Sequence, residues 1–182
     1  MRFVPLSRAE MTEAQARVVD DAIAGKRGSA PPPLLAWLAS PELAQRAQKL
    51  GEFARFETSL PPRLSELAIL VTARFWTSHY EWFAHKREAL RAGLEPEVID
   101  AIAARKAPQI HDAKGQAVYA YAVMLHEKHL VSDEVHEAVV REFGERGVVE
   151  LVGLLGYYTL VAMTLNAFEI GLPPGEVEEL TP

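Results

Sequence analysis

The sequence predicts an all-α fold in a single domain over residues 1–182. Apolar residues recur at helical spacing, alternating strand patterns are missing, and many segments begin at a serine or proline of the kind that starts helices. The length of 182 residues corresponds to about one domain. We expect roughly seven to nine helices, with an N-terminal helix and loop in residues 1–30 and an extended tail in residues 172–182.

The first predicted helix covers about Ser7–Ala24, because Ser7 and Glu10 form the Ser-x-x-Glu pattern of a capping box. A glycine-rich loop follows and ends at residues 31–33, where three successive prolines remove three backbone donors. A short helix is expected to start near Leu34.

Three helices are expected in the middle of the chain, with a break between the second and the third. Ser40 and Pro41 supply a cap and a first helical residue, which predicts a helix to about Phe56. A second helix starts at residues 60–62, and the aromatic and β-branched residues 75–77 should end it. Ser78 is a good cap for a new helix that runs to Arg91.

The C-terminal half shows the same kinds of residues at the expected starts and ends of helices. The expected helices cover about 97–104, 112–128, 132–144 and 148–168, and the last is stopped by Gly171-Leu-Pro-Pro-Gly175. This last helix is apolar on nearly all sides, which predicts burial on all sides. Either it is a central core helix, or a second subunit covers one face. We favour the second interpretation and expect a homo-oligomer.

Charge and composition exclude several classes of protein. Acidic residues outnumber basic ones 25 to 19, and no Lys/Arg block is present, which argues against nucleic-acid binding. The absence of cysteine excludes a disulfide scaffold, a thiolate metal site and a thiol nucleophile. The start of the chain does not read as a signal peptide, and the apolar stretches are too short or too interrupted to span a bilayer confidently. We therefore expect a cytoplasmic protein with no membrane partner.

The residues that could carry chemistry gather between positions 66 and 85. Glu81 and His85 are four apart and share one helix face, where a carboxylate can fix the tautomer of an imidazole for general acid–base work. Glu66 stands in an apolar run and needs water, a functional role or a partner such as Arg74. The alternatives are structural: Ser78 and Glu81 also fit a capping box, and His85 could be a hydrogen-bonded core or surface histidine.

A metal site is the weaker interpretation of these residues. Carboxylate-bridged metal sites in helical bundles use Glu-x-x-His from two helices, whereas this chain has one Glu81-x-x-x-His85 and no second copy. His126 and His129 are three apart but lack a suitably spaced carboxylate. No metal and no cofactor are expected.

The same segment resembles the carboxymuconolactone decarboxylase family, within the alkylhydroperoxidase D-like superfamily. Redox members carry Glu, eleven residues and then Cys-x-x-Cys-x-x-x-His; here Ser78 and Glu81 stand at the two cysteine positions, between Glu66 and His85. A second similar stretch, Gly-Tyr-Tyr followed by Asn-Ala-Phe, covers residues 156–168. The resemblance extends over about residues 30–174.

The resemblance implies an all-α bundle with a central helical hairpin, assembled as homo-trimers or homo-hexamers, with a pocket between helices. It also implies decarboxylation of a small lactone or unsaturated carboxylic acid in aromatic compound catabolism, without a cofactor. Thiol peroxidase activity is excluded because both cysteines are missing. The alternatives are a lyase or hydrolase of another metabolite, or a helical oligomer that only binds a small ligand.

For such a reaction we expect His85 to act as the general acid/base, Glu81 to orient it, and Glu66 to be a second acid/base. Only one of the two adjacent tyrosines is expected to face the pocket. Candidates to bind substrate are Arg74, Ser78, Trp82, Tyr157, Tyr158 and Asn166.

Overall fold

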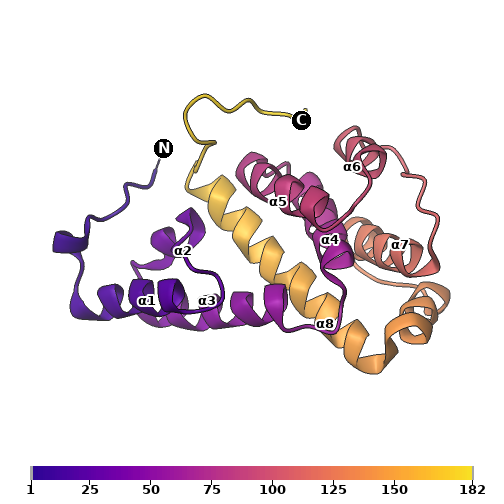
Figure 1. Ribbon diagram of the computed structural model, residues 1–182, viewed down its shortest axis with the longest axis horizontal. Helices are drawn as coiled ribbons and strands as arrows, with labels where there is room; N and C mark the ends of the chain where they lie inside the picture. The colour runs from indigo at the N-terminus through magenta and orange to yellow at the C-terminus, as the bar shows by residue number, and fades with distance from the viewer. Residues whose placement is uncertain (1, 182) are drawn as a thin grey trace.

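The computed structural model describes residues 2–181, and the all-α prediction is confirmed (Figure 1). These residues hold eight α-helices, one 3-10 turn and no strand. In chain order the elements are η1 (Arg8–Glu10), α1 (Glu13–Ala24), α2 (Pro32–Trp37), α3 (Pro41–Phe56), α4 (Pro62–Phe75), α5 (His79–Arg91), α6 (Pro96–Ala103), α7 (Ala113–Lys128) and α8 (Asp133–Ala167).

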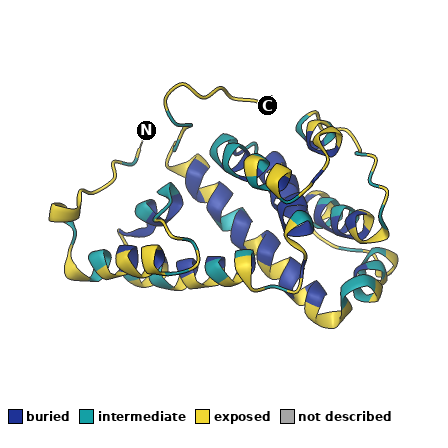
Figure 2. Cartoon of the chain, in the orientation of Figure 1, coloured by how far each residue is buried: buried dark blue, intermediate teal, exposed yellow. Residues whose placement is uncertain are grey.

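Two helices, α4 and α8, form the centre of the fold. α4 packs against α5, α7 and α8, while α8 also packs against α2 and α3 (Figure 1). All residues of α4 from 64 to 74 are buried, so this helix and the inner side of α8 appear dark blue in Figure 2. Because α4 is enclosed by other helices, most of its residues are apolar. Its few charged side chains need hydrogen-bond or ion-pair partners inside the protein.

The break between α4 and α5 lies where the sequence predicts it. Thr77 has a φ of 46°, which a non-glycine residue seldom adopts, and the chain turns there before α5 begins at His79. The turn places α5 back along α4, and the two helices form a hairpin. This hairpin brings residues from both sides of the break into contact.

The N-terminal helix is shorter than predicted. Ser7 and Glu10 do bond, with the Ser7 backbone N–H donating to Glu10 Oε2 at 2.8 Å, but this contact stabilises only the 3-10 turn. Thr12 forms a second capping box with Gln15, which starts α1 one turn later. Two competing caps within six residues thus divide the expected helix in two. A smaller difference concerns α2, which starts at Pro32 instead of Leu34 because proline is well suited to a first helical position.

Gly144 separates the two predicted C-terminal helices without ending α8. Its backbone angles, φ 70° and ψ 176°, lie in a region that is essentially restricted to glycine, and the helical axis changes direction there. No heavy atom lies within 4 Å of the position that a Cβ would take. The requirement for glycine is therefore conformational and not steric.

We expect Gly144→Ala to lower the free energy of unfolding by about 1–3 kcal/mol, because alanine must adopt that strained backbone conformation. Urea unfolding followed by circular dichroism measures the loss. Gly171→Ala is the matched control: Gly171 also has free space around its Cβ position but no positive φ, and its replacement should change stability by less than about 0.5 kcal/mol. Equal stabilities of the two variants would contradict this account of the kink.

One side of α8 is exposed in the single chain, so the helix is not buried on all sides within one subunit. Val149 is 71% exposed and Met163 is 50% exposed. By length and composition α8 could cross a membrane, but 61% of its most apolar window is buried against the rest of the fold. That burial is typical of a core helix.

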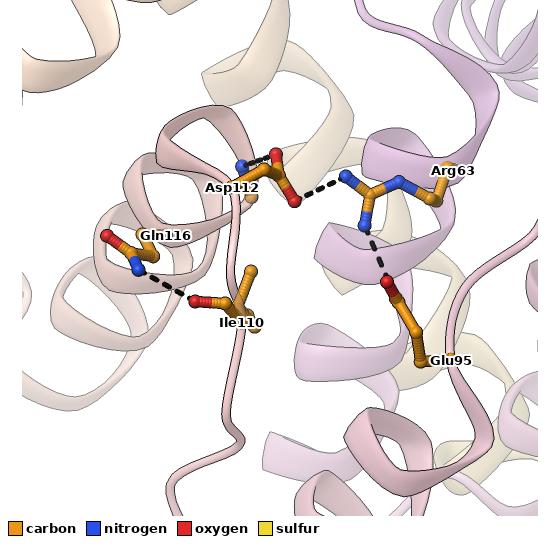
Figure 3. A network of polar contacts seen from close by, with 6 residues as sticks. Arg63, Glu95, Ile110, Asp112 and Gln116 are labelled. Atoms are coloured by element: carbon orange, nitrogen blue, oxygen red, sulfur yellow. Dashed lines mark hydrogen bonds and ion pairs between the residues drawn. The ribbon is translucent and has the colours of Figure 1, made fainter.

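An arginine at the start of α4 ties together the helices on one side of the fold. Arg63 Nη2 contacts Asp112 Oδ2 at 2.6 Å, and its Nη1 contacts Glu95 Oε2 at 3.4 Å (Figure 3). Asp112 also accepts a hydrogen bond from the backbone N–H of Gly115 and thereby caps α7. Burial raises the pKa of Asp112, but the bonds from Arg63 and Gly115 outweigh it and the pKa is lowered. The cluster fixes the starts of α4, α6 and α7 relative to one another.

The extended C-terminal tail lies along α5. Glu176 pairs with Arg87 at 2.8 Å, and Glu179 contacts both Lys86 and the indole N–H of Trp82. Leu180 is buried. These contacts cover the side of α5 that faces away from α8.

Candidate functional site

A cavity of about 110 Å³ lies between α2, α3, α5 and α8. Apolar residues of α2 and α8 line it together with polar residues of α3, α5 and α8. An engineered cavity of about 150 Å³ accommodates benzene, so this space is on the scale of a small planar molecule. The lining residues are Arg27, Pro31, Pro33, Leu34, Trp37, Gln48, Arg55, Tyr80, Glu81, Ala84, His85, Tyr157, Tyr158, Val161 and Leu165.

The α4–α5 hairpin brings Glu66 against His85. His85 Nδ1 and Glu66 Oε2 are 2.7 Å apart, and both residues are buried. Because a carboxylate only accepts hydrogen bonds, Nδ1 carries the hydrogen and Nε2 remains as the free ring nitrogen. The edge-on contact with Tyr158, whose ring centre is 4.8 Å away, holds the imidazole on its other side.

The structure corrects the expected role of Glu81. Glu66, and not Glu81, is the carboxylate that contacts His85. Both carboxyl oxygens of Glu81 are buried and have no hydrogen-bond partner. Burial raises the pKa of Glu81 well above its ordinary value, and the nearby Ser78 hydroxyl offsets only part of the rise. Burial therefore favours the protonated form of Glu81, which is able to donate a hydrogen bond.

The capping-box interpretation of Ser78 and Glu81 is wrong. Ser78 occupies the N-cap position of α5, but its hydroxyl accepts no hydrogen bond from the helix. The hydroxyl is fully buried and has no hydrogen-bond partner. Ser78 thus lies beside Glu81, in the interior, without a capping function.

Both tyrosines of the Tyr157–Tyr158 pair line the cavity, contrary to the expectation that only one would. Their rings meet edge to face with centres 5.2 Å apart. Burial raises the pKa of Tyr158 well above its ordinary value, and the charge of Glu66 adds to the effect. The Tyr157 hydroxyl is accommodated by Gly51 of α3, because a Cβ at that position would lie 2.2 Å from it.

Several buried polar atoms around the cavity have no hydrogen-bond partner. They belong to three lining residues and one neighbour: Gln48 Nε2, both Glu81 oxygens, Tyr158 Oη and Ser78 Oγ. Buried polar groups are nearly always paired, and an unpaired one costs about 1–3 kcal/mol. Their convergence on one cavity indicates a place for polar groups of a ligand or for bound water.

Two cationic side chains of the cavity were missed by the sequence analysis. Arg27 comes from the loop before α2 and its Nη2 lies 3.4 Å from the Tyr157 hydroxyl. Arg55 comes from the last turn of α3 and contacts Glu88 at 3.7 Å. Both line the cavity, so they are the groups placed to pair with a carboxylate there.

Three of the predicted substrate-binding residues lie elsewhere. Arg74 lies at the opposite end of α4 from Glu66, which excludes it as the partner of that carboxylate. The amide of Asn166 is exposed and donates to the carbonyl of Trp76 at 2.8 Å. Trp82 is buried under the C-terminal tail and is a core residue.

The histidine pair 126 and 129 does not form a cluster either. His126 Nε2 lies 2.9 Å from the Thr72 hydroxyl, while His129 is exposed at the end of α7. Among residues 2–181 no group of three or more His, Asp or Glu side chains is arranged to hold a metal ion.

A match to a known family covers α3 to α6 and most of α7. Residues 41–124 match the profile of the Carboxymuconolactone decarboxylase family. The resemblance seen in the sequence is confirmed over these residues, which are less than half of the chain. The matched stretch contains the α4–α5 hairpin, and with it Glu66, Glu81 and His85.

The fold agrees with this match to the carboxymuconolactone decarboxylase family. A solved structure of the debrominase Bmp8, a cysteine-to-alanine variant in complex with 2,3,4-tribromopyrrole, is similar with a TM-score of 0.71. The two chains share 15% sequence identity, and the similarity covers 93% of this chain and 90% of the debrominase. At that identity the comparison shows the fold alone. A comparison with curated proteins finds no significant match.

Proposed function

We propose that this protein is a cofactor-independent decarboxylase of a small lactone or unsaturated carboxylic acid. The observation that carries the proposal is the cavity itself. Its lining combines His85, a buried Glu81 with a raised pKa, an unpaired Tyr158 hydroxyl and two arginines. Glu66 does not line the cavity but contacts His85 from behind it. A reaction through an enolate requires a group that transfers the proton and groups that stabilise the negative oxygen, and the cavity supplies both kinds.

In the proposed reaction, Arg27 and Arg55 bind a carboxylate of the substrate that is retained. The carboxylate that leaves lies toward the apolar lining residues Leu34, Val161 and Leu165. An apolar environment disfavours the charged carboxylate more than the neutral CO₂ that it becomes. The C–C bond to this carboxylate breaks, CO₂ departs, and the electron pair moves into the conjugated lactone carbonyl.

The resulting enolate oxygen would accept hydrogen bonds from the neutral carboxyl of Glu81 and the hydroxyl of Tyr158. A protonated carboxylic acid beside a tyrosine is a known way to stabilise an enolate. His85 takes a proton from water at its free Nε2 and gives that proton to a carbon of the conjugated enolate, which returns the imidazole to its starting form. Glu66 holds the ring in the correct tautomer throughout. The balance is one proton consumed and one CO₂ released.

The direct test is CO₂ release from 4-carboxymuconolactone and from related lactone and unsaturated acids, measured with the purified full chain. Arg27→Gln should raise KM by roughly 10- to 100-fold, because a charged hydrogen bond to the substrate carboxylate is worth about 1.5–3 kcal/mol. The matched control is Arg46→Gln, an exposed arginine of α3 that pairs with Glu42 outside the cavity. Binding without any CO₂ release would reject the decarboxylase proposal.

We further propose that the protein works as a homo-trimer or homo-hexamer in the cytoplasm, in aromatic compound catabolism. Val149 and Met163 are exposed apolar residues of α8, and Val149 lines a groove together with Leu50 and Phe53 of α3. This groove of about 520 Å³ has an almost wholly apolar surface and lies between the two helices. Exposed apolar surface of this kind is typical of subunit contacts. Light scattering in solution tests the assembly, against a single-chain mass of 20.2 kDa.

A further inference from the structure

A second cavity, of about 120 Å³, lies where α4 and α7 meet the segment that follows α6. The ribbon of Figure 1 shows α6 and α7 on the same side of α4. This cavity shares no lining residue with the one that contains His85. Three cationic residues line it, Arg74, Arg105 and Lys106, together with a single carboxylate, Glu127.

The three cations have no ion-pair partner among residues 2–181. Arg74 Nη1 and Arg105 Nη2 both donate to the hydroxyl of Thr77, at 3.1 and 3.2 Å. Two guanidinium groups therefore share one neutral oxygen. Burial and the charge of Arg105 lower the pKa of Arg74, as expected when two positive charges are held together without an anion.

Arg74 is itself only 4% exposed, and one of its donors is unused. Its Nη2 donates to the carbonyl of Thr181 at 2.7 Å, but its Nε has no partner. A buried charged donor without an acceptor is costly. An oxygen anion in the cavity would both pair this nitrogen and remove the repulsion between the two arginines.

The opposite wall of the cavity is aromatic. The ring of Phe75 stacks on His126, with centres 4.9 Å apart and planes 18° apart, and Tyr119 lies beside them. His126 is held by its contact with Thr72, so the wall is fixed. Phe75 remains 37% exposed, which leaves its ring accessible to a flat apolar group.

We propose that this cavity is a separate binding site for a small oxyanion, a carboxylate or a phosphate. The anion pairs with Arg74, Arg105 and Lys106, and any planar part of the ligand lies against Phe75. The carboxylate of Glu127 repels an anion, so the negative charge of a bound ligand must lie next to the arginines and away from Glu127. The proposal is independent of the decarboxylase function, because none of its residues belongs to the first cavity.

Isothermal titration calorimetry of the full chain at low salt tests the site, with inorganic phosphate and benzoate as probes. We expect saturable binding with one site per chain, and at least about tenfold weaker binding in Arg105→Gln. Arg105 is exposed, so its replacement should not unfold the protein. Tighter binding of benzoate would identify an aryl carboxylate as the ligand type, and tighter binding of phosphate a phosphate ester.

Two control variants separate this site from general charge effects and from the first cavity. Arg141→Gln removes the same charge from an exposed position of α8 that lines neither cavity and should leave both affinities within about twofold. Because the first cavity is proposed to bind a carboxylate through Arg27, the control there uses phosphate: Arg27→Gln should leave the phosphate affinity within about twofold. No saturable binding of either probe, an equal loss in Arg141→Gln, or a loss of phosphate affinity in Arg27→Gln alone would overturn the proposal.

Discussion

Replacing His85 by glutamine should lower kcat for CO₂ release by roughly 10²–10⁴-fold, because general acid–base catalysis by a positioned side chain contributes about that much. Glutamine is similar in size and can still donate to Glu66, so the buried carboxylate keeps a partner. The fold should therefore survive. Steady-state kinetics measures the loss, and urea unfolding checks that the variant is folded.

The matched control for this experiment is His136→Gln. His136 lies on α8, lines neither cavity and makes only a ring contact with Tyr121, at 6.3 Å. Its replacement should leave kcat within about twofold. Partial recovery of His85→Gln activity by added imidazole would assign the lost step to proton transfer. If His85→Gln is as active as the control variant, His85 is a structural residue and the proposed mechanism fails.

Glu66→Gln separates the two parts of the pair. The amide can still contact Nδ1, but it can also offer a donor, so that the ring is free to adopt the other tautomer. A smaller loss than in His85→Gln would indicate that Glu66 orients the imidazole and does not itself exchange the proton. Comparable losses in both variants would favour the original assignment of Glu66 as a second acid/base.

The helices were predictable because their ends are encoded locally. Pro41, Pro62 and Pro96 each stand at a first helical position, and the break before Ser78 follows from residues that are unfavourable in a helix. For the first helix the local signals were misleading because two of them competed. The capping box at Thr12 divides the first helix, although the pattern at Ser7 is equally good.

The partner of His85 could not be derived from helical spacing. The i, i+4 rule brings Glu81 and His85 to the same face, but it does not determine which way each side chain turns. The turn at Thr77 places Glu66 against the imidazole from the neighbouring helix. Glu81 instead turns into the interior beside Ser78. The difference between the two carboxylates is thus tertiary in origin.

The arginines of the cavity were missed for a similar reason. Arg27 lies in a loop and Arg55 in an amphipathic helix, and neither has a neighbouring pattern that indicates a site. Arg55 reaches the cavity because α3 packs against α8, and Arg27 reaches it from the loop before α2. One signal was available: Gly51 interrupts a helical pattern, which often marks a close approach, and here it accommodates the Tyr157 hydroxyl.

The raised pKa of Glu81 predicts an unusual dependence of stability on pH. A buried carboxyl with a raised pKa keeps its proton in the folded state, while the unfolded chain loses that proton above its ordinary pKa of about 4.3. Folding then becomes less favourable as the pH rises, because the folded state binds more protons than the unfolded state. The stability is present below the unfolded pKa and is lost progressively until the folded pKa is reached.

Glu81→Gln should remove this dependence. As the pH rises above the unfolded pKa, the wild-type chain should lose up to about 1.4 kcal/mol of stability per pH unit relative to the variant, until the folded pKa is reached, since one proton is bound only in the folded state. Urea unfolding of both proteins at several pH values measures the difference, and the other titrating groups cancel because they are common to both. Parallel pH profiles would mean that Glu81 is ionised in the folded protein, and it could then donate no hydrogen bond to an enolate.

The same position tests the catalytic role that we propose for the neutral acid. Glutamine keeps an N–H donor, so Glu81→Gln should retain part of the activity, whereas Glu81→Leu removes the donor and should lower kcat by roughly 10²–10³-fold. Both substitutions remove the titrating group, so both should flatten the pH profile of stability relative to wild type. Full activity in Glu81→Leu, together with that flattened profile, would show that the buried acid costs the protein stability without contributing to the reaction.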